Sequence, residues 1–315
     1  MTTATANKVK APKKGFKLDR QMIPTLAAVV IFILMIIMGQ ALFGTYIRLG
    51  FISSLFIDHA YLIILAVAMT LPILTGGIDL SVGAIVAITA VVGLKLANAG
   101  GPAFPKADAK KSLKMSKIIM LLIGAVFGLL AGTLIEEFNM QPFIATLSTM
   151  FLARGLASII STDSLTFPQG NDFSFISNVI KIIDNPKISN DLSFNVGVII
   201  ALVVVVFGYV FLHHTRTGRT IYAIGGSRSS AELMGLPVKR TQYIIYLTSA
   251  TLAALASIVY TANIGSAKNT VGVGWELDAV ASVVIGGTII TGGFGYVLGS
   301  VLGSLVRSIL DPLTS

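Results

Sequence analysis

An aspartate and a serine stand between long apolar runs in the segment "ILTGGIDLSVGA", residues 73–84. Ionisable residues in such surroundings are functional candidates by default, because an apolar medium penalises their charge. Two interpretations of Asp79 and Ser81 stay open. Their oxygens cap the helix predicted to begin near Val82 by accepting a free backbone N–H, or they lie on a translocation route or in a polar lock that holds one state of a transporter.

Other polar residues in apolar stretches are candidates for the same pathway. Arg154, in "TMFLARGLASII", and Asp278, in "WELDAVAS", are possible partners of Asp79. The sequence alone does not pair them. The predicted pathway or lock consists of Thr75, Asp79, Ser81, Arg154, Asn269 and Asp278.

Residue types needed for catalysis are scarce. The chain has no cysteine, which excludes thiol nucleophiles, disulfides and cysteine-ligated metals. His59, His213 and His214 show no HExxH or similar spacing, so we expect no metal site. The motifs GxxxxGK(S/T) of phosphate-binding loops and GxSxG of hydrolases do not occur. We therefore expect a chain that is not an enzyme and binds no cofactor itself.

The composition is that of a polytopic membrane protein. Apolar residues make up 54% of the 315 residues and charged residues 12%, with a mean hydropathy of +0.86. Helix is predicted throughout, because a bilayer offers backbone groups no water and the period-two alternation of a barrel is absent. Spans of about 20 apolar residues cross a bilayer core. The predicted spans are 23–43, 59–75, 82–97, 118–135, 143–160, 195–212, 243–264, 277–291 and 294–310.

Basic residues indicate which loops face the cytoplasm. The net charge of +9 is concentrated beside apolar spans, which favours contact with a lipid bilayer over nucleic acid. We expect a basic cytoplasmic tail at 1–22, a transmembrane domain at 23–315, an outside loop at 161–194 and a basic cytoplasmic loop at 213–242. The lysine-rich segment "PKADAKKSLKMSK" disagrees, because it follows three predicted spans. Either a span is miscounted or these lysines are tolerated outside.

Two series of glycines, each recurring every fourth residue, predict packing seams between helices. Such stripes let two helix backbones approach closely in lipid. The series are Gly124, Gly128 and Gly132, and Gly295, Gly299 and Gly303.

An internal repeat accounts for part of the aspartate segment. "TGGIDLSVGA" at Thr75 recurs as "TGGFGYVLGS" at Thr291, 216 residues later, and many transporters are built from such repeats. The shared Thr-Gly-Gly can supply a break between two helices. Asp79 is not shared, since its counterpart is Gly295, so the turn alone does not require a carboxylate.

Four motifs, in the order of a known family, carry a resemblance. They are "GGIDLSVGAIVAI", "RTGRTIYAIGG", "SAELMGL" and "ELDAVASVVIGGTIITGGFGYVLGS". From about residue 23 to its end the chain resembles the permease subunits of ribose-class ABC sugar importers, and among these the galactofuranose and fructose permeases. The resemblance implies an all-α polytopic fold of about nine to ten transmembrane helices, similar to the vitamin B12 importer permease (a type II ABC importer), in a bacterial cell membrane.

The resemblance also implies partners and a coupling site. The partners are two cytoplasmic ABC ATPase domains that hold ATP and Mg, an extracytoplasmic sugar-binding protein, and a second permease, with a sister chain favoured over a homodimer. Arg228 is placed to help dock an acidic rim of the ATPase. The alternative to a coupling helix is an ordinary solvated loop. The family's coupling helix matches Ser230, Ala231, Glu232, Leu233, Met234, Gly235 and Leu236.

The leading hypothesis is the membrane-spanning permease of an ATP-driven monosaccharide importer. The family has a further span after "GSVLGSLVRSILDPLTS", so a final span is expected to be missing. A secondary transporter would instead use Asp79, Arg154 or Asp278 as a charge relay, and a non-transporting scaffold would need only the glycine seams. Within the ABC class, permeases for nucleosides or branched-chain amino acids are further alternatives. The sequence does not name the sugar.

Overall fold

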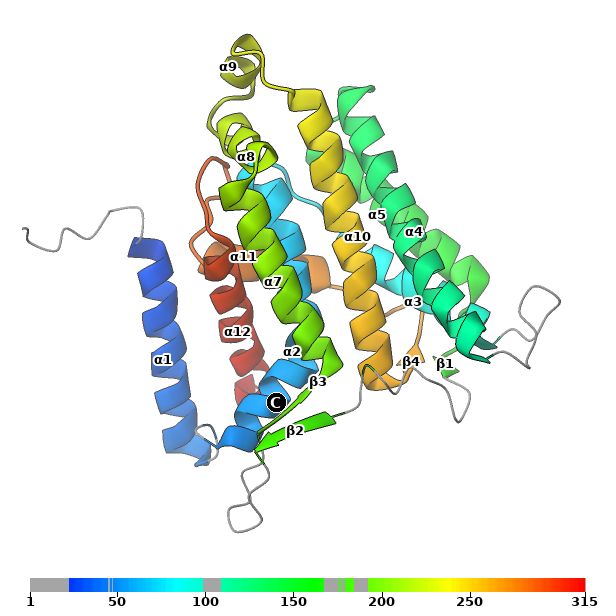
Figure 1. Cartoon of the computed structure of the whole chain (residues 1–315), viewed down its shortest axis with the longest axis vertical. Helices are drawn as coiled ribbons and strands as arrows, with labels where there is room; N and C mark the ends of the chain where they lie inside the picture. The colour runs from blue at the N-terminus through cyan, green and yellow to red at the C-terminus, as the bar shows by residue number, and fades with distance from the viewer. Residues whose placement is uncertain are drawn as a thin grey trace, which may run out of the picture.

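The chain is almost entirely helical within the residues that the structure describes (Figure 1). The computed structural model describes residues 23–44, 46, 48–98, 109–166, 176, 179–183 and 192–314. The predicted basic tail at 1–22 and much of the predicted outside loop at 161–194 lie outside these residues.

The helices, in chain order, are α1 (Ile23–Phe43), α2 (Leu49–Leu74), α3 (Val82–Asn98), α4 (Ala109–Glu136), α5 (Pro142–Ile160), α7 (Val196–His214), α8 (Arg216–Gly226), α9 (Arg228–Leu233), α10 (Val238–Ile264), α11 (Trp275–Ile285) and α12 (Val297–Thr314). Two short antiparallel pairs complete the described elements. β1 (Leu165–Thr166) pairs with β4 (Ser266–Ala267), and β2 (Val179–Ile183) pairs with β3 (Leu192–Asn195).

Six of the described helices are long and apolar enough to cross a membrane, namely α1, α2, α4, α5, α7 and α10. The apolar helices α3 and α12 are shorter. These helices confirm the prediction of a polytopic, mostly helical membrane protein. The count of nine to ten spans stays a prediction.

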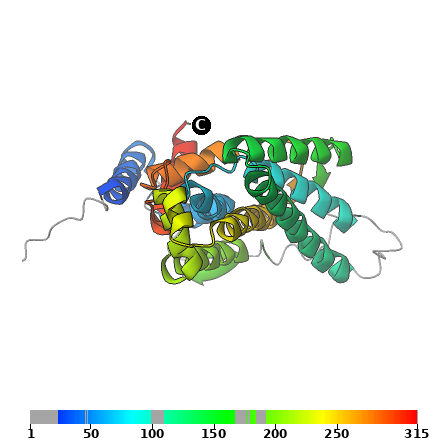
Figure 2. The ribbon, with the colours of Figure 1, turned by 90° about the horizontal axis from the view of Figure 1, so that it is seen from above.

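The predicted span at 277–291 is wrong in length. α11 has 11 residues, which is about 16 Å of helix and too short for a bilayer core of roughly 30 Å. It ends at Ile285, where Gly286 and Gly287 follow, and Gly287 takes a left-handed φ of +92° that typically stops a helix. In Figures 1 and 2, α11 lies across the direction of its long neighbours.

α10 lies at the centre of the bundle and packs against α2, α3 and α4, as the view from above shows (Figure 2). α3 and the second half of α2 are buried almost throughout. By contrast, α1 lies at the edge, and only 17% of its apolar window is buried. Apolar outer faces of this kind suit contact with lipid chains.

The first glycine series lies against the backbone of α10. A Cβ placed on Gly124 would lie 2.7 Å from Ala250 O, and one on Gly128 would lie 2.5 Å from Tyr246 O. A Cβ on Gly132 would lie 2.9 Å from the ring of Tyr243, which also belongs to α10. Residues without a Cβ therefore let α4 and α10 pack closely.

The second series is divided between a loop and a helix. Gly299 and Gly303 belong to α12, and a Cβ on either would meet the backbone of α11 or the turn that follows it. Gly295 precedes α12 and packs against Thr288. The glycines of this series in α12 therefore let α12 pack closely against α11 and the turn after it.

The two copies of the repeated turn touch each other. Gly76 and Gly292 both take a left-handed backbone conformation, with φ of +77° and +89°, which glycine reaches without steric penalty. The N–H of Gly293 donates to Leu74 O over 2.9 Å. The repeat therefore brings the breaks before α3 and α12 together.

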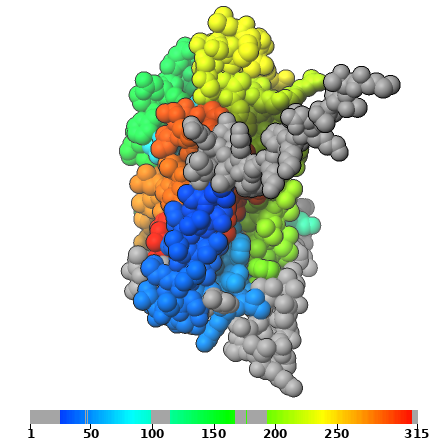
Figure 3. Space-filling view, turned by 90° about the vertical axis from the view of Figure 1, so that its left-hand side faces the viewer, coloured from blue at the N-terminus to red at the C-terminus, as the bar shows by residue number. Residues whose placement is uncertain are grey.

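α8 and α9 project from one end of the bundle, where α4 ends and α10 begins (Figures 1 and 3). The described part of the lysine-rich segment begins α4 and lies at the opposite end. Because α4 runs without a break, these lysines and α9 are separated by a full span.

Candidate functional site

α9 is a short, defined helix between two turns. Ser227, in an extended conformation, caps it, since its hydroxyl accepts from the N–H of Ser230 over 3.2 Å. Beyond Met234 the chain reverses at Gly235, whose φ is +72°. Of the predicted coupling segment at 230–236, residues 230–233 therefore lie in α9, and Met234, Gly235 and Leu236 follow its end.

One face of α9 is buried against the protein, and the end of the helix is exposed to solvent. Ala231 is fully buried against Ile224 and Val238. Leu233 is 89% exposed and Met234 66% exposed at the tip, and the space-filling view shows this end protruding (Figure 3). An anchored helix with an exposed apolar tip can transmit force to or from a partner.

Arg228 fastens α9 to the end of α4. Its Nη2 lies 2.9 Å from Glu136 Oε2, and its Nε lies 3.1 Å from Glu232 Oε1. The Glu136 side chain is only 3% exposed. Docking of Arg228 on an acidic rim stays a prediction, but its guanidinium is already paired within the chain.

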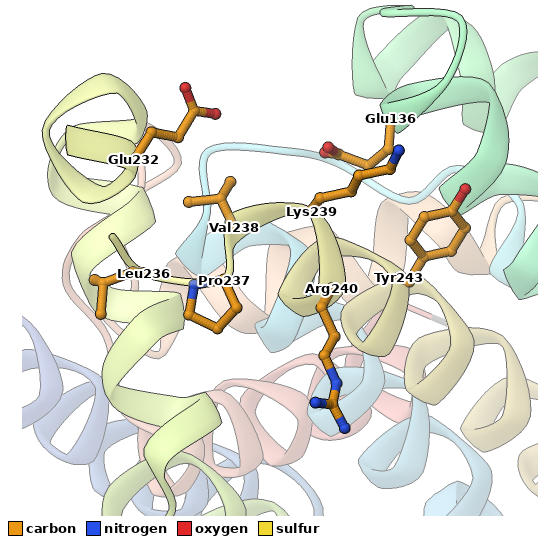
Figure 4. Close-up of a pocket in the computed structure, with 8 residues that line it drawn as sticks. All are labelled: Glu136, Glu232, Leu236, Pro237, Val238, Lys239, Arg240 and Tyr243. Carbon is orange, nitrogen blue, oxygen red and sulfur yellow. The ribbon is translucent and has the colours of Figure 1, made fainter. Parts of the chain in front are cut away.

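A groove of about 700 Å³ lies between α9 and the adjoining ends of α4 and α10 (Figure 4). At its rim Lys239 Nζ lies 2.8 Å from Glu137 Oε1, and the Tyr243 hydroxyl donates to the same carboxylate over 3.1 Å. The bonds from Lys239 and Tyr243 hold the pKa of Glu137 below its usual value. The residues lining the groove are Glu136, Glu232, Leu236, Pro237, Val238, Lys239, Arg240 and Tyr243.

Asp79 is 1% exposed, and its two carboxylate oxygens accept hydrogen bonds from two different parts of the fold. Its Oδ1 accepts from the N–H of Ser81 over 3.1 Å and from the Ser81 hydroxyl over 2.5 Å, at the start of α3. Its Oδ2 accepts from the Ser249 hydroxyl of α10 over 2.8 Å. The carboxylate therefore caps the turn before α3 and also bonds this turn to α10. A place on a translocation route or in a polar lock stays a prediction.

Sequence reasoning missed the polar face of α10. Tyr246 is fully buried, its hydroxyl has no hydrogen-bond partner among the described residues, and it packs against Gly77 beside the break before α3. Spacing of three or four residues on one helical face was the available signal. The buried polar residues of this face are Gln242, Tyr246, Ser249, Ser257 and Thr261.

The two partners predicted for Asp79, Arg154 and Asp278, bond to other groups. Arg154 Nη1 instead donates to the carbonyls of Asn269, over 3.1 Å, and Val271, over 2.5 Å. Asp278 pairs with Arg307, whose Nε lies 2.9 Å from Oδ1. Helix packing turns each charge toward a nearer partner.

Of the other predicted pathway residues, Asn269 joins the Arg154 group, and its Nδ2 donates to Ser158 Oγ over 3.1 Å. Thr75 caps the end of α2, where its hydroxyl donates to Pro72 O over 2.8 Å. The structure thus separates the predicted set into Asp79 with Ser81, Arg154 with Asn269, Asp278 with Arg307, and Thr75 at the end of α2. Among the described residues, no three histidine, aspartate or glutamate side chains are placed to hold a metal ion.

The chain is similar to known membrane permeases. Residues 51–315 match the family model described as branched-chain amino acid transport system / permease component. The chain is 96% identical over 315 residues to the fructose import permease protein FruG of Bifidobacterium longum (strain NCC 2705), covering 100% of this chain and 90% of that protein. No solved structure matches the chain.

More distant relatives come from Escherichia coli (strain K12). The chain is 36% identical over 292 residues to the inner membrane ABC transporter permease protein YjfF, covering 93% of this chain and 84% of that one. It is 35% identical over 248 residues to the ribose import permease protein RbsC, with coverage of 79% and 72%.

Proposed function

The chain belongs to the branched-chain amino acid transport system / permease component family, and on this premise we propose that it is the membrane-spanning permease subunit of an ABC importer for fructose. The observation that carries the proposal is the 96% identity with a fructose import permease protein along all 315 residues. The ribose import permease among its relatives supports a monosaccharide as the substrate class.

ATP hydrolysis is assigned to a separate cytoplasmic ATPase, which holds ATP and Mg. The sequence contains no GxxxxGK(S/T) loop, so this chain has no such cradle for nucleotide phosphates. The end that carries α9 faces the cytoplasm in this proposal, in keeping with the arginines of the predicted loop at 213–242. An extracytoplasmic binding protein delivers the sugar at the opposite end.

α9 is the coupling helix of the proposal, with Leu233 and Met234 inserted into the ATPase. The anchoring of α9 by Arg228 and Ala231 supports this role, because a rigid lever converts closure of the ATPase into motion of the spans. Sugar passes between this chain and a second permease, with a sister chain favoured. A fold similar to the vitamin B12 importer permease belongs to the same proposal.

The coupling role is tested by Gly235→Pro in the reconstituted importer. Proline requires a φ near −65°, whereas Gly235 has +72°, so the turn after α9 must change. We expect the loss of fructose-stimulated ATP hydrolysis while the chain stays in the membrane. Gly226→Ala is the control, because Gly226 has an ordinary φ and nothing lies within 4 Å of an added Cβ. Unchanged stimulation in Gly235→Pro would exclude the assignment.

The substrate and the partners are tested by purification of the tagged chain from its native membrane. We expect an ABC ATPase, a second permease and a binding protein to purify with it. The binding protein is then assayed for fructose, ribose and galactose derivatives by calorimetry. Preference for another sugar would correct the substrate while leaving the permease role intact.

A further inference from the structure

A second pocket lies beside α9 and has a different chemical character from the groove of Figure 4. Its volume is about 610 Å³. Arg216 and Arg219 of α8 and Arg240 of α10 line it, and no acidic residue is among the described residues that do so. We call it the arginine pocket; the other lining residues are Thr217, Thr220, Leu236, Pro237, Thr241 and Ile244.

The three arginines differ from their basic neighbours in having no carboxylate partner in the part of the chain that the structure describes. Arg228 and Lys239, at the same end of the bundle, are paired with glutamates. No carboxylate of the described residues lies within ion-pair distance of the three arginines of the pocket. Unpaired like charges around one cavity repel each other, which an anion between them would relieve.

The pocket lies where two membrane spans end. α7 ends at His214, two residues before Arg216, and α10 begins at Val238, two residues before Arg240. The arginine side chains are therefore at the level of lipid headgroups. Leu236 and Ile244 add apolar lining, which suits the glycerol and upper acyl atoms of a lipid better than a fully hydrated ion.

We infer that the arginine pocket binds the phosphate headgroup of an anionic phospholipid. Guanidinium groups present a planar fork of donors that matches phosphate oxygens, and basic pockets between transmembrane helices bind anionic headgroups. A bound lipid would tie α8 to α10 on either side of α9. This inference is independent of which solute crosses the membrane.

The test is native mass spectrometry of the purified full chain in neutral detergent. The chain is titrated with phosphatidylglycerol and, separately, with zwitterionic phosphatidylcholine. We expect one phosphatidylglycerol to bind more tightly than phosphatidylcholine. Each arginine replaced should weaken that site about fivefold, so Arg219→Gln with Arg240→Gln should weaken it about 25-fold. Phosphatidylcholine binding should stay the same, which shows that the variant is folded.

The control removes the same charge far from the pocket. Lys114, near the start of α4, and Lys268, directly after β4, are exposed. The start of α4 and β4 lie at the end of the bundle opposite α8 and α9 (Figure 1), so Lys114→Gln with Lys268→Gln should leave phosphatidylglycerol affinity unchanged. Equal affinity in the arginine variant and the wild type would overturn the inference. Displacement of the lipid by millimolar inorganic phosphate would assign the pocket to a soluble phosphate instead. Lost ATPase binding with unchanged lipid affinity would assign it to protein docking.

Discussion

Arg228 Nη2 lies 2.9 Å from Glu136 Oε2, although 92 residues separate them in the chain. This ion pair joins α9 to the end of a long transmembrane helix. Glu136 is nearly inaccessible, whereas the Arg228 side chain is 44% exposed. The pair therefore fixes α9 to a nearly buried group at the end of α4.

Removal of Arg228 should show how much its ion pair with Glu136 contributes to stability. Arg228→Ala leaves the Glu136 carboxylate unpaired, and we expect the free energy of unfolding to fall by about 1–2 kcal/mol. Adding Glu136→Gln should recover part of that loss, because a neutral amide is less costly to bury. Unfolding of the purified chain in detergent measures both. The matched control is Glu232→Gln, whose exposed i,i+4 pair should contribute less than about 0.5 kcal/mol. Equal losses of stability in Arg228→Ala and Glu232→Gln would contradict the prediction.

Ser249→Ala tests whether Asp79 does more than cap a helix. The change removes only the bond from α10 to Asp79, and the bonds from Ser81 remain. We expect stability to fall by about 1 kcal/mol and fructose uptake to fall more than stability explains. Ser257→Ala is the control, since its hydroxyl also joins α10 to α3, at Val86 O over 2.9 Å, away from Asp79. Equal uptake in the two variants would leave Asp79 with a structural role alone.

Gly128→Ala should separate α4 from α10. The added Cβ would lie 2.5 Å from Tyr246 O, and overpacking of this kind typically lowers stability by about 1–3 kcal/mol. Gly155→Ala, on the exposed face of α5, meets nothing within 4 Å. It should be neutral or stabilise by up to about 1 kcal/mol through helix propensity. Thermal unfolding of both variants gives the comparison, and equal melting temperatures would refute the packing role of Gly128.

Acid should weaken the contact between Glu137 and Lys239. Because the folded pKa of Glu137 is lowered, its contribution to stability is present above its unfolded pKa and is lost as pH falls through the folded pKa. The difference in melting temperature between wild type and Lys239→Gln should therefore shrink from about pH 6 to about pH 3. Lys268→Gln should show no such convergence. A constant difference across this range would rule out the Glu137 contact as its source.

Local patterns predicted most of the helices. Long apolar runs indicated α1, α4, α5, α7 and α10, because hydropathy and the need to satisfy backbone groups in lipid act along the chain. α11 was predicted too long, since hydropathy does not register that Gly286 and Gly287 stop a helix. The polar face of α10 follows a spacing of three or four residues, but its polar residues lie inside an apolar span, where hydropathy alone does not distinguish them.

By itself the sequence determined a membrane-spanning helical chain and its permease family, because hydropathy and motif order can be read along the chain. Its resemblance to that family implied a coupling helix at 230–236, and the structure places the short helix at 228–233. Only the tertiary structure decided which charges meet. Asp79 bonds to Ser249, 170 residues away, and Arg154 and Asp278 turn to other partners. Such pairs depend on how helices pack and rotate against one another, and a charge in a low-dielectric bundle bonds to whichever group that packing brings within about 3 Å.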